Sequence, residues 1–312
     1  LVVYTTIPGS IPKEPHQHTD DIRRYRMKVA FQGIRGAYSE VAAKQLLGRS
    51  CRTVPKVSFE EIFDAVQSGS VHRGVIPIEN SLAGSIHANY DLLLSRNVHI
   101  VGETYMNIEH VLMAHPDASL RRLKRVRSHP QALAQCGAFF SAHSSITAQP
   151  YFDTAGAAKS VIDESDPATG AIASQYAARL YGLKTLKRNL QDRSNNVTRF
   201  LIISRKPQIP RNRSRTKCSI AFRPARNQPG ILFKILGVFS LRDIDLTKIE
   251  SRPDPENPFE YLFYLDFDGS PEDERVAHAL DHLQEVVLRS RLLGAYTRGK
   301  EEFRRRVKKP SS

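Results

Sequence analysis

A polar cluster, Asn195-Asn196-Val197-Thr198-Arg199-Phe200, runs directly into the apolar residues Leu201-Ile202-Ile203. The apolar run has the length and the β-branched content of a buried strand. An amide, a hydroxyl and a guanidinium are therefore carried on or beside a rigid element, which suits binding or catalysis on a small anion. A polar loop before an ordinary strand, or a glycosylation sequon at Asn196-Val197-Thr198, would also fit these residues.

The composition indicates a globular chain with room for two cores. It has 312 residues, of which 40% are hydrophobic and 25% are charged, and chains of this length commonly form more than one domain. No stretch approaches the 18 or so apolar residues of a membrane-spanning helix, so we expect no membrane partner. Cys51, Cys136 and Cys218 form no CxxC pair, which argues against disulfides and zinc and favours a reducing compartment.

The formal net charge of +14 raises the possibility of nucleic-acid binding. However, the basic residues concentrate in two segments, 205–217 and 298–309, outside the apparent folded units. The sequence shows no zinc-ligand spacing, RNP-like aromatic motif or obvious helix-turn-helix. We therefore expect no nucleic-acid partner, and a mildly basic body would equally attract a carboxylate substrate.

The first 200 residues divide into a leader and an α/β region. Residues 1–26 contain Pro8, Pro12 and Pro15 and are predicted to be an irregular leader. Residue 1 is leucine, so any targeting peptide would lie upstream of this sequence. From residue 28, strand and helix patterns alternate, which predicts an α/β architecture. Residues 27–204 are long enough for two α/β lobes with a cleft between them.

Capping signals place the helices of this region. Ser58 and Glu61 form a capping-box pattern, and Gly69 ends that helix. Pro130 stands in the first turn of a later helix, a favoured place for proline. Thr154 and Ser174 are predicted to cap two further helices. The predicted helices span 40–47, 59–68, 130–140, 155–162 and 175–180, and a further one follows Ser85 and ends at Leu94. The predicted strands span 29–31, 74–78, 99–101, 108–114 and 171–173.

A second folded unit follows a basic stretch. Residues 205–216, with Pro207 and Pro210, are predicted to be a linker. Residues 217–297 then alternate as strand, helix, two strands, helix and strand, which is the ferredoxin-like βαββαβ order. Residues 298–312 form a basic tail. The predicted strands span 217–222, 245–251, 259–268 and 292–296, and the helices span 230–240 and 272–288.

Several stretches together resemble one enzyme family. The run Thr198-Arg199-Phe200, preceded by Asn195-Asn196, resembles the TRF signature of prephenate dehydratases. The small unit resembles an ACT domain, with Pro229-Gly230-Ile231-Leu232 and Glu250-Ser251-Arg252-Pro253 at its two phenylalanine-site motifs. The resemblance covers about residues 28–298 and is strongest to the plastid branch of plants, the arogenate dehydratases. Further matching stretches are Gly33-Ile34-Arg35-Gly36-Ala37-Tyr38-Ser39-Glu40, Pro77-Ile78-Glu79-Asn80-Ser81 with Gly84-Ser85, Ser128-His129-Pro130-Gln131-Ala132-Leu133, Asp153-Thr154-Ala155 and Ala171-Ile172-Ala173-Ser174.

The resemblance implies a fold, a reaction and a location. The first domain would be two lobes similar to a type II periplasmic binding protein, with the active site in the cleft. The reaction would remove the ring hydroxyl as water and the ring carboxylate as carbon dioxide, giving phenylalanine from arogenate or phenylpyruvate from prephenate. Aromatisation drives it, so no metal or redox cofactor is expected. A homodimer or homotetramer in the plastid stroma is implied, with the cytoplasm as the alternative.

The resemblance also assigns the catalytic groups. Thr198 is the candidate acid, and because a hydroxyl is a weak acid it is better viewed as a positioned donor to the leaving oxygen. Glu79 and His129 are our candidates for supplying the net proton. The alternatives are that Glu79 is a structural carboxylate at a strand end and that His129 orients the helix at Pro130.

Substrate binding is assigned to residues around these groups. A tight ion pair to the departing carboxylate would favour the ground state, so cationic contacts such as Arg199 should grip the side-chain end of the substrate. Arg199→Lys should then weaken substrate capture. Helix capping is the alternative role of the Ser/Gly stretch. The candidate substrate-binding residues are Arg199, Asn80, Ser81, Ser85, Asn196 and Phe200.

The ACT-like unit carries a candidate site for phenylalanine as a feedback inhibitor. Free N–H groups at the helix that begins near Gly230 suit a carboxylate, and Glu250 could face an amino group. A solvated loop and strand end is the alternative. Two other functions remain open, a prephenate-specific dehydratase and a non-catalytic amino-acid sensor. The candidate effector residues are Asn227, Pro229, Gly230, Ile231, Leu232, Glu250, Ser251, Arg252 and Pro253.

Overall fold

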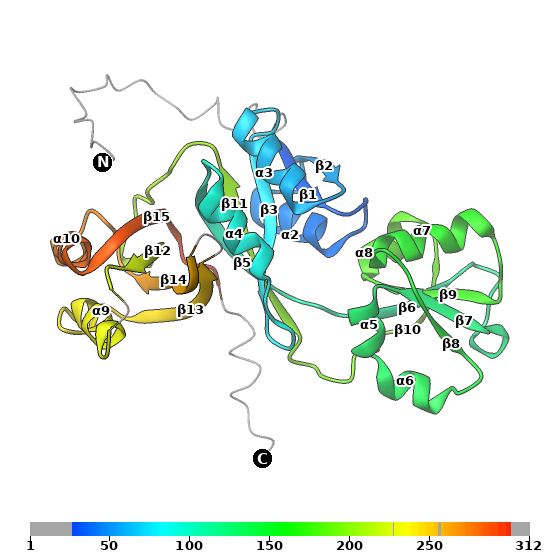
Figure 1. Cartoon of the computed structure of the whole chain (residues 1–312). Coiled ribbons are helices and arrows are strands. Elements are labelled where there is room, and N and C mark those ends of the chain that lie inside the picture. The colour runs from blue at the N-terminus through cyan, green and yellow to red at the C-terminus, as the bar shows by residue number, and fades with distance from the viewer. Residues whose placement is uncertain (1–26, 227, 255–256, 301–312) are drawn as a thin grey trace, which may run out of the picture.

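The computed structural model describes residues 27–226, 228–254 and 257–300. The predicted leader 1–26, most of the basic tail and the candidate effector residue Asn227 lie outside the described residues. Within them the chain forms three β-sheets, each with its own helices (Figure 1). Two sheets make the lobes of the first domain, and the third makes the C-terminal unit that resembles an ACT domain and is called the ACT domain below.

Lobe 1 is built around a mixed sheet in the order β2-β1-β3-β11-β5, with the short β4 paired to β3. Strand β11 is antiparallel to both of its neighbours, β3 and β5. It therefore lies in the interior of the sheet, as its apolar run predicts. The elements are β1 (Lys28–Gln32), α2 (Tyr38–Leu47), β2 (Arg52–Lys56), α3 (Phe59–Ser68), β3 (Arg73–Asn80), β4 (Gly84–Ser85), α4 (His87–Ser95), β5 (His99–Asn107) and β11 (Val197–Ser204).

Lobe 2 has a five-stranded sheet in the order β10-β6-β9-β7-β8. Its helices pack on both faces around two apolar clusters. The chain enters this lobe after β5 and returns from it at β11, so two segments join the lobes (Figure 1). The elements are β6 (Val111–Ala114), η1 (Leu120–Arg122), β7 (Arg125–Ser128), α5 (Pro130–Ala134), α6 (Gly137–Ala142), β8 (Thr147–Pro150), α7 (Thr154–Glu164), β9 (Thr169–Ala173), α8 (Gln175–Leu180) and β10 (Lys184–Lys187).

Two local predictions in lobe 2 were wrong. The helix predicted over 130–140 is divided into α5 and α6, because the backbone leaves the helical conformation at Cys136. The carboxylate of Asp192 then accepts hydrogen bonds from the N–H groups of Gly137 and Ala138 at the start of α6. Asp153, and not Thr154, caps α7 by accepting a hydrogen bond from the Gly156 N–H. The cap at Ser174 is confirmed, because its Oγ accepts the Ala177 N–H at 3.0 Å.

The C-terminal unit has the predicted βαββαβ order, with its sheet arranged β13-β14-β12-β15. Helices α9 and α10 cover one face of this sheet, around Phe222, Phe239 and Phe267. A short helical turn, η2, lies in the predicted linker. The elements are η2 (Arg213–Arg215), β12 (Thr216–Pro224), α9 (Ile231–Ser240), β13 (Leu246–Asp254), β14 (Asn257–Asp268), α10 (Glu274–Val286) and β15 (Val287–Thr297).

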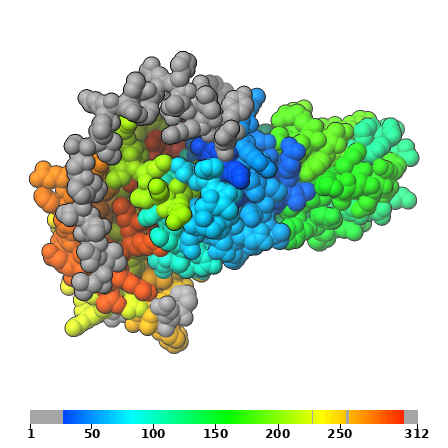
Figure 2. Space-filling model, turned by 90° about the horizontal axis from the view of Figure 1, so that it is seen from above, coloured from blue at the N-terminus to red at the C-terminus, as the bar shows by residue number. Residues whose placement is uncertain are grey.

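The second face of the ACT sheet packs directly on lobe 1. Tyr264 and Leu293 of the ACT sheet belong to the same apolar cluster as Tyr90, Ile100 and Leu201 of lobe 1. Figure 2 shows the result, in which lobe 1 and the ACT domain form one body and lobe 2 projects from it. Within the described residues, no helix is both long and apolar enough to cross a membrane.

Candidate active site

A cavity of about 700 Å³ lies between the two lobes. Lobe 1 supplies the end of β3, the start of β11 and the starts of α2 and α4, whereas lobe 2 supplies the starts of α5 and α7. Five of the candidate site residues line it, namely Thr198, Asn80, Ser85, His129 and Phe200. The other lining residues are Gln32, Gly33, Ala37, Tyr38, Ser39, Phe59, Pro77, Ala83, Gly84, Ile86, Ile108, His110, Gln131, Ala132, Gln135, Phe152, Asp153 and Thr154.

The hydroxyl of Thr198 is oriented by a single amide. Asn80 Oδ1 accepts the N–H groups of Leu82 and Ala83, at 3.0 and 2.9 Å, which fixes the orientation of its amide. Asn80 Nδ2 therefore donates to Thr198 Oγ1 at 2.9 Å. Because the threonine oxygen accepts this hydrogen bond, its own proton is available to a group in the cavity.

The same amide begins a chain of hydrogen bonds that connects the lobes. Asn80 Nδ2 also donates to Asn196 Oδ1 at 2.8 Å, and Asn196 Nδ2 donates to Gln135 Oε1 at 2.8 Å. Gln135 Oε1 is 2.9 Å from His110 Nε2, and His110 Nδ1 is 2.9 Å from the Tyr38 hydroxyl. Since Gln135 Oε1 is an acceptor, His110 carries its proton on Nε2 and accepts through Nδ1.

Three members of this chain were not predicted as site residues. Tyr38 and Gln135 lie in or beside stretches that carry the family resemblance, so a closer inspection of those stretches could have found them. His110 stands alone directly before the apolar run Val111–Ala114, and no spacing marks it. It is 2% exposed. Burial lowers the pKa of His110, partly offset by its hydrogen bond to Gln135, so we infer a neutral imidazole at pH 7.

Acidification should therefore lower the free energy of unfolding, because His110 is buried as a neutral group. The folded pKa is lowered below the unfolded value of about 6.5, so the unfolded chain binds the proton more readily between the two values. This residue's contribution to stability is full above about pH 6.5 and is lost as the pH falls toward the folded pKa. Each unit by which folding lowers the pKa of His110 corresponds to about 1.4 kcal/mol of folding free energy.

Urea unfolding at pH 5.5 and 7.5, for wild type and His110→Gln, would measure this effect. The wild type should lose more free energy of unfolding on acidification than the variant does. Equal losses would show that His110 does not titrate in this range.

The cavity is suited to anions without a cationic side chain. Among the described residues, its lining includes no lysine or arginine. Helices α2 and α4 begin at it without a side-chain cap, and the free N–H groups and dipole of a helix start favour negative charge. The start of α7 also reaches the cavity, but the carboxylate of Asp153 already caps it. A carboxylate could thus be held there without the tight ion pair that would stabilise the ground state.

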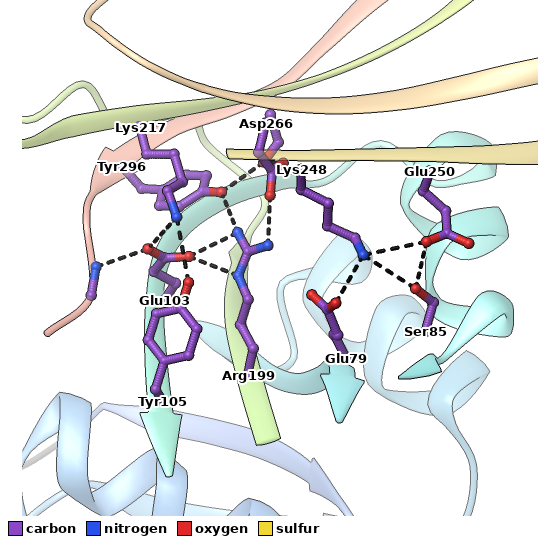
Figure 3. A network of polar contacts seen from close by, with 12 residues as sticks. Glu79, Ser85, Glu103, Tyr105, Arg199, Lys217, Lys248, Glu250, Asp266 and Tyr296 are labelled. Carbon is purple, nitrogen blue, oxygen red and sulfur yellow. Dashed lines mark hydrogen bonds and ion pairs between the residues drawn. The ribbon is translucent and has the colours of Figure 1, made fainter. Parts of the chain in front are cut away.

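The prediction that Arg199 binds substrate was wrong. Successive side chains of a strand point to opposite faces, so Thr198 faces the cavity and Arg199 faces away from it. Arg199 is 5% exposed and makes ion pairs with Glu103 Oε2 at 2.8 Å and Asp266 Oδ2 at 2.5 Å (Figure 3). Burial alone would lower the pKa of Arg199, but Asp266, Tyr296 and Glu103 outweigh it and hold the pKa above its usual range.

Glu79 also points away from the cavity, against the prediction that it supports proton transfer. Its carboxylate makes an ion pair of 3.1 Å with Lys248 of the ACT domain (Figure 3). The alternative interpretation, a structural carboxylate at a strand end, is the one the structure supports. His129 keeps both interpretations, since it lines the cavity and its Nδ1 also accepts the Gln131 N–H of α5 at 3.3 Å.

Three other predicted binding residues have different partners. Ser81 does not line the cavity, because its Oγ donates to Asn195 O at 2.6 Å and accepts the Val197 N–H at 2.9 Å. Asn196 does not line it either and acts through Asn80 and Gln135. Ser85 lines the cavity, but its Oγ donates to Glu250 Oε2 at 2.6 Å.

The predicted effector residues are divided between the two faces of the ACT sheet. Glu250 faces lobe 1 and bonds Ser85 and His87, so its assignment to an effector amino group was wrong. Burial raises the pKa of Glu250, but hydrogen bonds from Ser85 and His87 outweigh it and lower the pKa overall. Arg252 pairs with Asp91 of lobe 1 at 2.6 Å. Ser251 and Pro253 alternate with these residues and are exposed.

The start of α9 keeps the geometry expected of an effector site. Gly230 adopts a φ of +79°, which glycine accommodates without strain, and it precedes the first helical residue, Ile231. No side chain caps this helix start among the described residues. Ile231 and Leu232 are partly buried, whereas Pro229 and Gly230 are exposed.

Together, the fold and the cleft define a two-lobed, periplasmic-binding-protein-like domain joined to an ACT domain. Residues 29–208 match the family model "Prephenate dehydratase", and residues 225–285 match "ACT domain". The chain is 45% identical over 295 residues to the Arabidopsis thaliana protein "Arogenate dehydratase/prephenate dehydratase 2, chloroplastic", covering 91% of this chain and 77% of that one. It therefore belongs to the prephenate dehydratase family, which are carbon–oxygen lyases.

Two solved structures are similar to this chain in fold. One is a prephenate dehydratase from Arthrobacter aurescens in complex with L-Phe, which has a TM-score of 0.81, 30% identity and 92% coverage of each chain. Another, described as GqqA, a novel type of quorum quenching acylase, has a TM-score of 0.80 and 35% identity. It covers 89% of this chain and 99% of its own.

Proposed function

We propose that this protein converts L-arogenate to L-phenylalanine by decarboxylating dehydration, with prephenate as a possible second substrate. The observation that carries the proposal is the cleft itself, where an oriented threonine hydroxyl faces a cavity suited to anions and free of lysine and arginine among the described residues. The similarity to a relative named for both substrates supports it.

The reaction needs one proton. The bond from the ring to its carboxylate breaks, and its electron pair completes the aromatic ring as carbon dioxide leaves. The ring C–O bond breaks with its electron pair on oxygen, and a proton converts the departing hydroxide to water. Thr198 donates a hydrogen bond to this oxygen as its negative charge develops, which stabilises the transition state more than the ground state.

The net proton is assigned to a histidine. With Glu79 turned toward the ACT domain, His129 is the predicted proton carrier that still lines the cavity. Both nitrogens of the other lining histidine, His110, are engaged by Gln135 and Tyr38. Asn80 is then a positioning residue, because it orients the threonine oxygen through its amide.

We also propose phenylalanine as the effector of the ACT domain. The uncapped helix start at Gly230 suits its carboxylate, and Pro229, Ile231, Leu232, Ser251 and Pro253 remain candidate contacts. The structure of a similar enzyme in complex with L-Phe supports this choice. Phenylalanine in contact with Ser251 and Pro253 would touch β13, and Glu250 of β13 accepts a hydrogen bond from the cavity residue Ser85. This contact gives effector binding a route to the cleft.

A homodimer or homotetramer in the plastid stroma completes the proposal. Strand β13 is an edge of the ACT sheet, and edge strands readily pair with another chain. Ile249 on this strand, Tyr261 on the neighbouring one and Phe233 on α9 are large apolar side chains exposed to solvent. The relative named chloroplastic supports the location. Light scattering during size-exclusion chromatography would give the oligomer size.

Turnover on the two substrates tests the catalytic proposal. The purified protein should release phenylalanine from arogenate, with a lower kcat/KM for the release of phenylpyruvate from prephenate. Activity on prephenate alone would favour the prephenate-specific alternative. No turnover on either substrate, combined with phenylalanine binding by isothermal titration calorimetry, would identify a non-catalytic sensor instead.

A further inference from the structure

The side of β11 opposite Thr198 is buried in a cluster of charges between the two domains. Lobe 1 supplies Arg199 and Glu103, and the ACT domain supplies Lys217 and Asp266 (Figure 3). The exposed fractions of the four residues lie between 2% and 7%. Two cations and two carboxylates balance in charge, as buried ions must to avoid a large desolvation penalty.

The contacts of this cluster converge on the guanidinium of Arg199. Its Nε and Nη2 both approach Glu103 Oε2 at 2.8 Å, Nη1 approaches Asp266 Oδ2 at 2.5 Å, and Nη2 donates to the Tyr296 hydroxyl at 3.0 Å. Ser219 holds the other side of this arrangement, with its Oγ 2.5 Å from Asp266 Oδ1 and 2.6 Å from the Tyr296 hydroxyl. Two strands of the ACT sheet, β14 and β15, therefore directly bind the side chain of Arg199 on β11, the strand that also carries Thr198 and is called the catalytic strand below.

The pairing of β11 with β3 explains why the contacts of Arg199 affect the position of the Thr198 hydroxyl. Thr198 pairs with Asn80 of β3, which orients its oxygen, but the register of β11 against β3 shifts between Arg199 and Phe200. The strand is thus irregular immediately beside Thr198, and the ion pairs of Arg199 add a fixed point there. An error of about 1 Å in the position of a reacting group can lower a rate by about 10²-fold.

We propose that Arg199 is a positioning residue through which the ACT domain holds the Thr198 hydroxyl in its reactive position. The inference rests on the proposed function, and it assigns part of the active site's geometry to Asp266 and Tyr296 of the ACT domain. Arg199 acts from behind the strand and does not touch the substrate. Any movement of the ACT sheet that draws Asp266 from Arg199 would then lower turnover without closing the cavity.

Asp266→Asn is the first test, because asparagine keeps the shape of the side chain while it removes the charge and replaces one of the two acceptor oxygens with an N–H donor. Per folded chain, kcat should fall about tenfold or more, with KM for arogenate within about threefold of wild type. Near-ultraviolet circular dichroism and urea unfolding at the assay temperature measure the fraction of folded protein. Dividing the rate by this fraction separates a loss of folded protein from a loss of kcat.

Arg291→Gln is the matched control. Arg291 also reaches from the ACT domain into lobe 1, where it donates to the carbonyl oxygens of Leu94, Arg96 and Val98, none of which belongs to β11. This variant should lose stability and keep its kcat within about twofold. Equal losses of kcat in Arg291→Gln and Asp266→Asn would show general loosening of the interface and would overturn the proposal.

Tyr296→Phe keeps the test decisive if Asp266→Asn does not fold. It removes one oxygen from the cluster and leaves all four charges in place. A lower kcat with KM little changed supports the proposal, and a kcat within about twofold of wild type overturns it. A raised KM with unchanged kcat would also overturn it, since that result would place Arg199 in substrate binding. A wild type inactive on both substrates would instead refute the proposed function, and this inference with it.

Discussion

Replacing Thr198 by alanine is expected to lower kcat about 10²- to 10⁴-fold and to leave KM nearly unchanged. A positioned proton donor to the departing oxygen contributes a factor of this size, and its hydrogen bond strengthens only as charge develops on that oxygen. The fold should survive, because Thr198 lies at the cavity and its loss leaves only one amide hydrogen of Asn80 without its partner. Steady-state kinetics on arogenate, with circular dichroism for folding, make the measurement.

Thr198→Ser is the control for this prediction. Serine keeps the hydroxyl and the acceptor for Asn80 but loses the methyl group that limits rotation of the side chain. We expect its kcat within about tenfold of wild type, well above that of the alanine variant. If alanine and serine variants turned over equally, the hydroxyl would have no part in catalysis, and the expulsion of the ring oxygen would have to be assigned to another group.

The alternation of side chains along a strand explains which site residues the sequence could locate. Thr198 and Phe200 line the cavity and Arg199 does not, because neighbouring side chains of a strand face opposite sides. The same rule separates Asn80 from Glu79 at the end of β3. This period of two was present in the sequence, so the opposite direction of Arg199 and Glu79 was predictable once both stretches were placed on strands.

The partners of these misassigned residues were not predictable in the same way. Arg199 is bound by Asp266, which is 67 residues away along the chain and in another domain. No local pattern specifies that contact, because it depends on how the ACT sheet packs on lobe 1. The hydrogen bond between His110 and Gln135 likewise depends on the tertiary placement of two segments that both adjoin the cleft.

Which strands could be recognised from the sequence also depends on whether local residues or long-range pairing fix them. The apolar strands β3, β9 and β11 were recognisable because their burial on both faces produces continuous apolar runs. The edge strands β2, β8 and β10 were not predicted, and neither was the short interior strand β7. All four residues of β8 are exposed, and its sequence, Thr-Ala-Gln-Pro, has no apolar alternation. Such a strand is fixed by pairing with its neighbour β7, which a single sequence does not reveal.

Gly294→Ala is expected to lower the free energy of unfolding by about 3 kcal/mol, the upper part of the usual range for overpacking. Gly294 lies in β15 where this strand crosses lobe 1, and an added Cβ would stand 2.1 Å from the carbonyl oxygen of Ile100. Ile100 cannot move aside easily, because β5 is paired with β11 at Ile203. The clash is with backbone, so no change of side-chain rotamer relieves it, and the ACT sheet must separate from β5.

Gly237→Ala gives the opposite expectation and serves as the control. Gly237 lies inside α9, and nothing lies within 4 Å of a Cβ added there. Alanine should stabilise that helix by about 0.5–1 kcal/mol, since glycine loses more backbone freedom on folding. Urea unfolding of both variants would compare them directly. If Gly294→Ala were as stable as wild type, β15 would not be seated on β5 as described. The same variant should also lose kcat, because separation of the ACT sheet withdraws Asp266 and Tyr296 from Arg199, behind the catalytic strand.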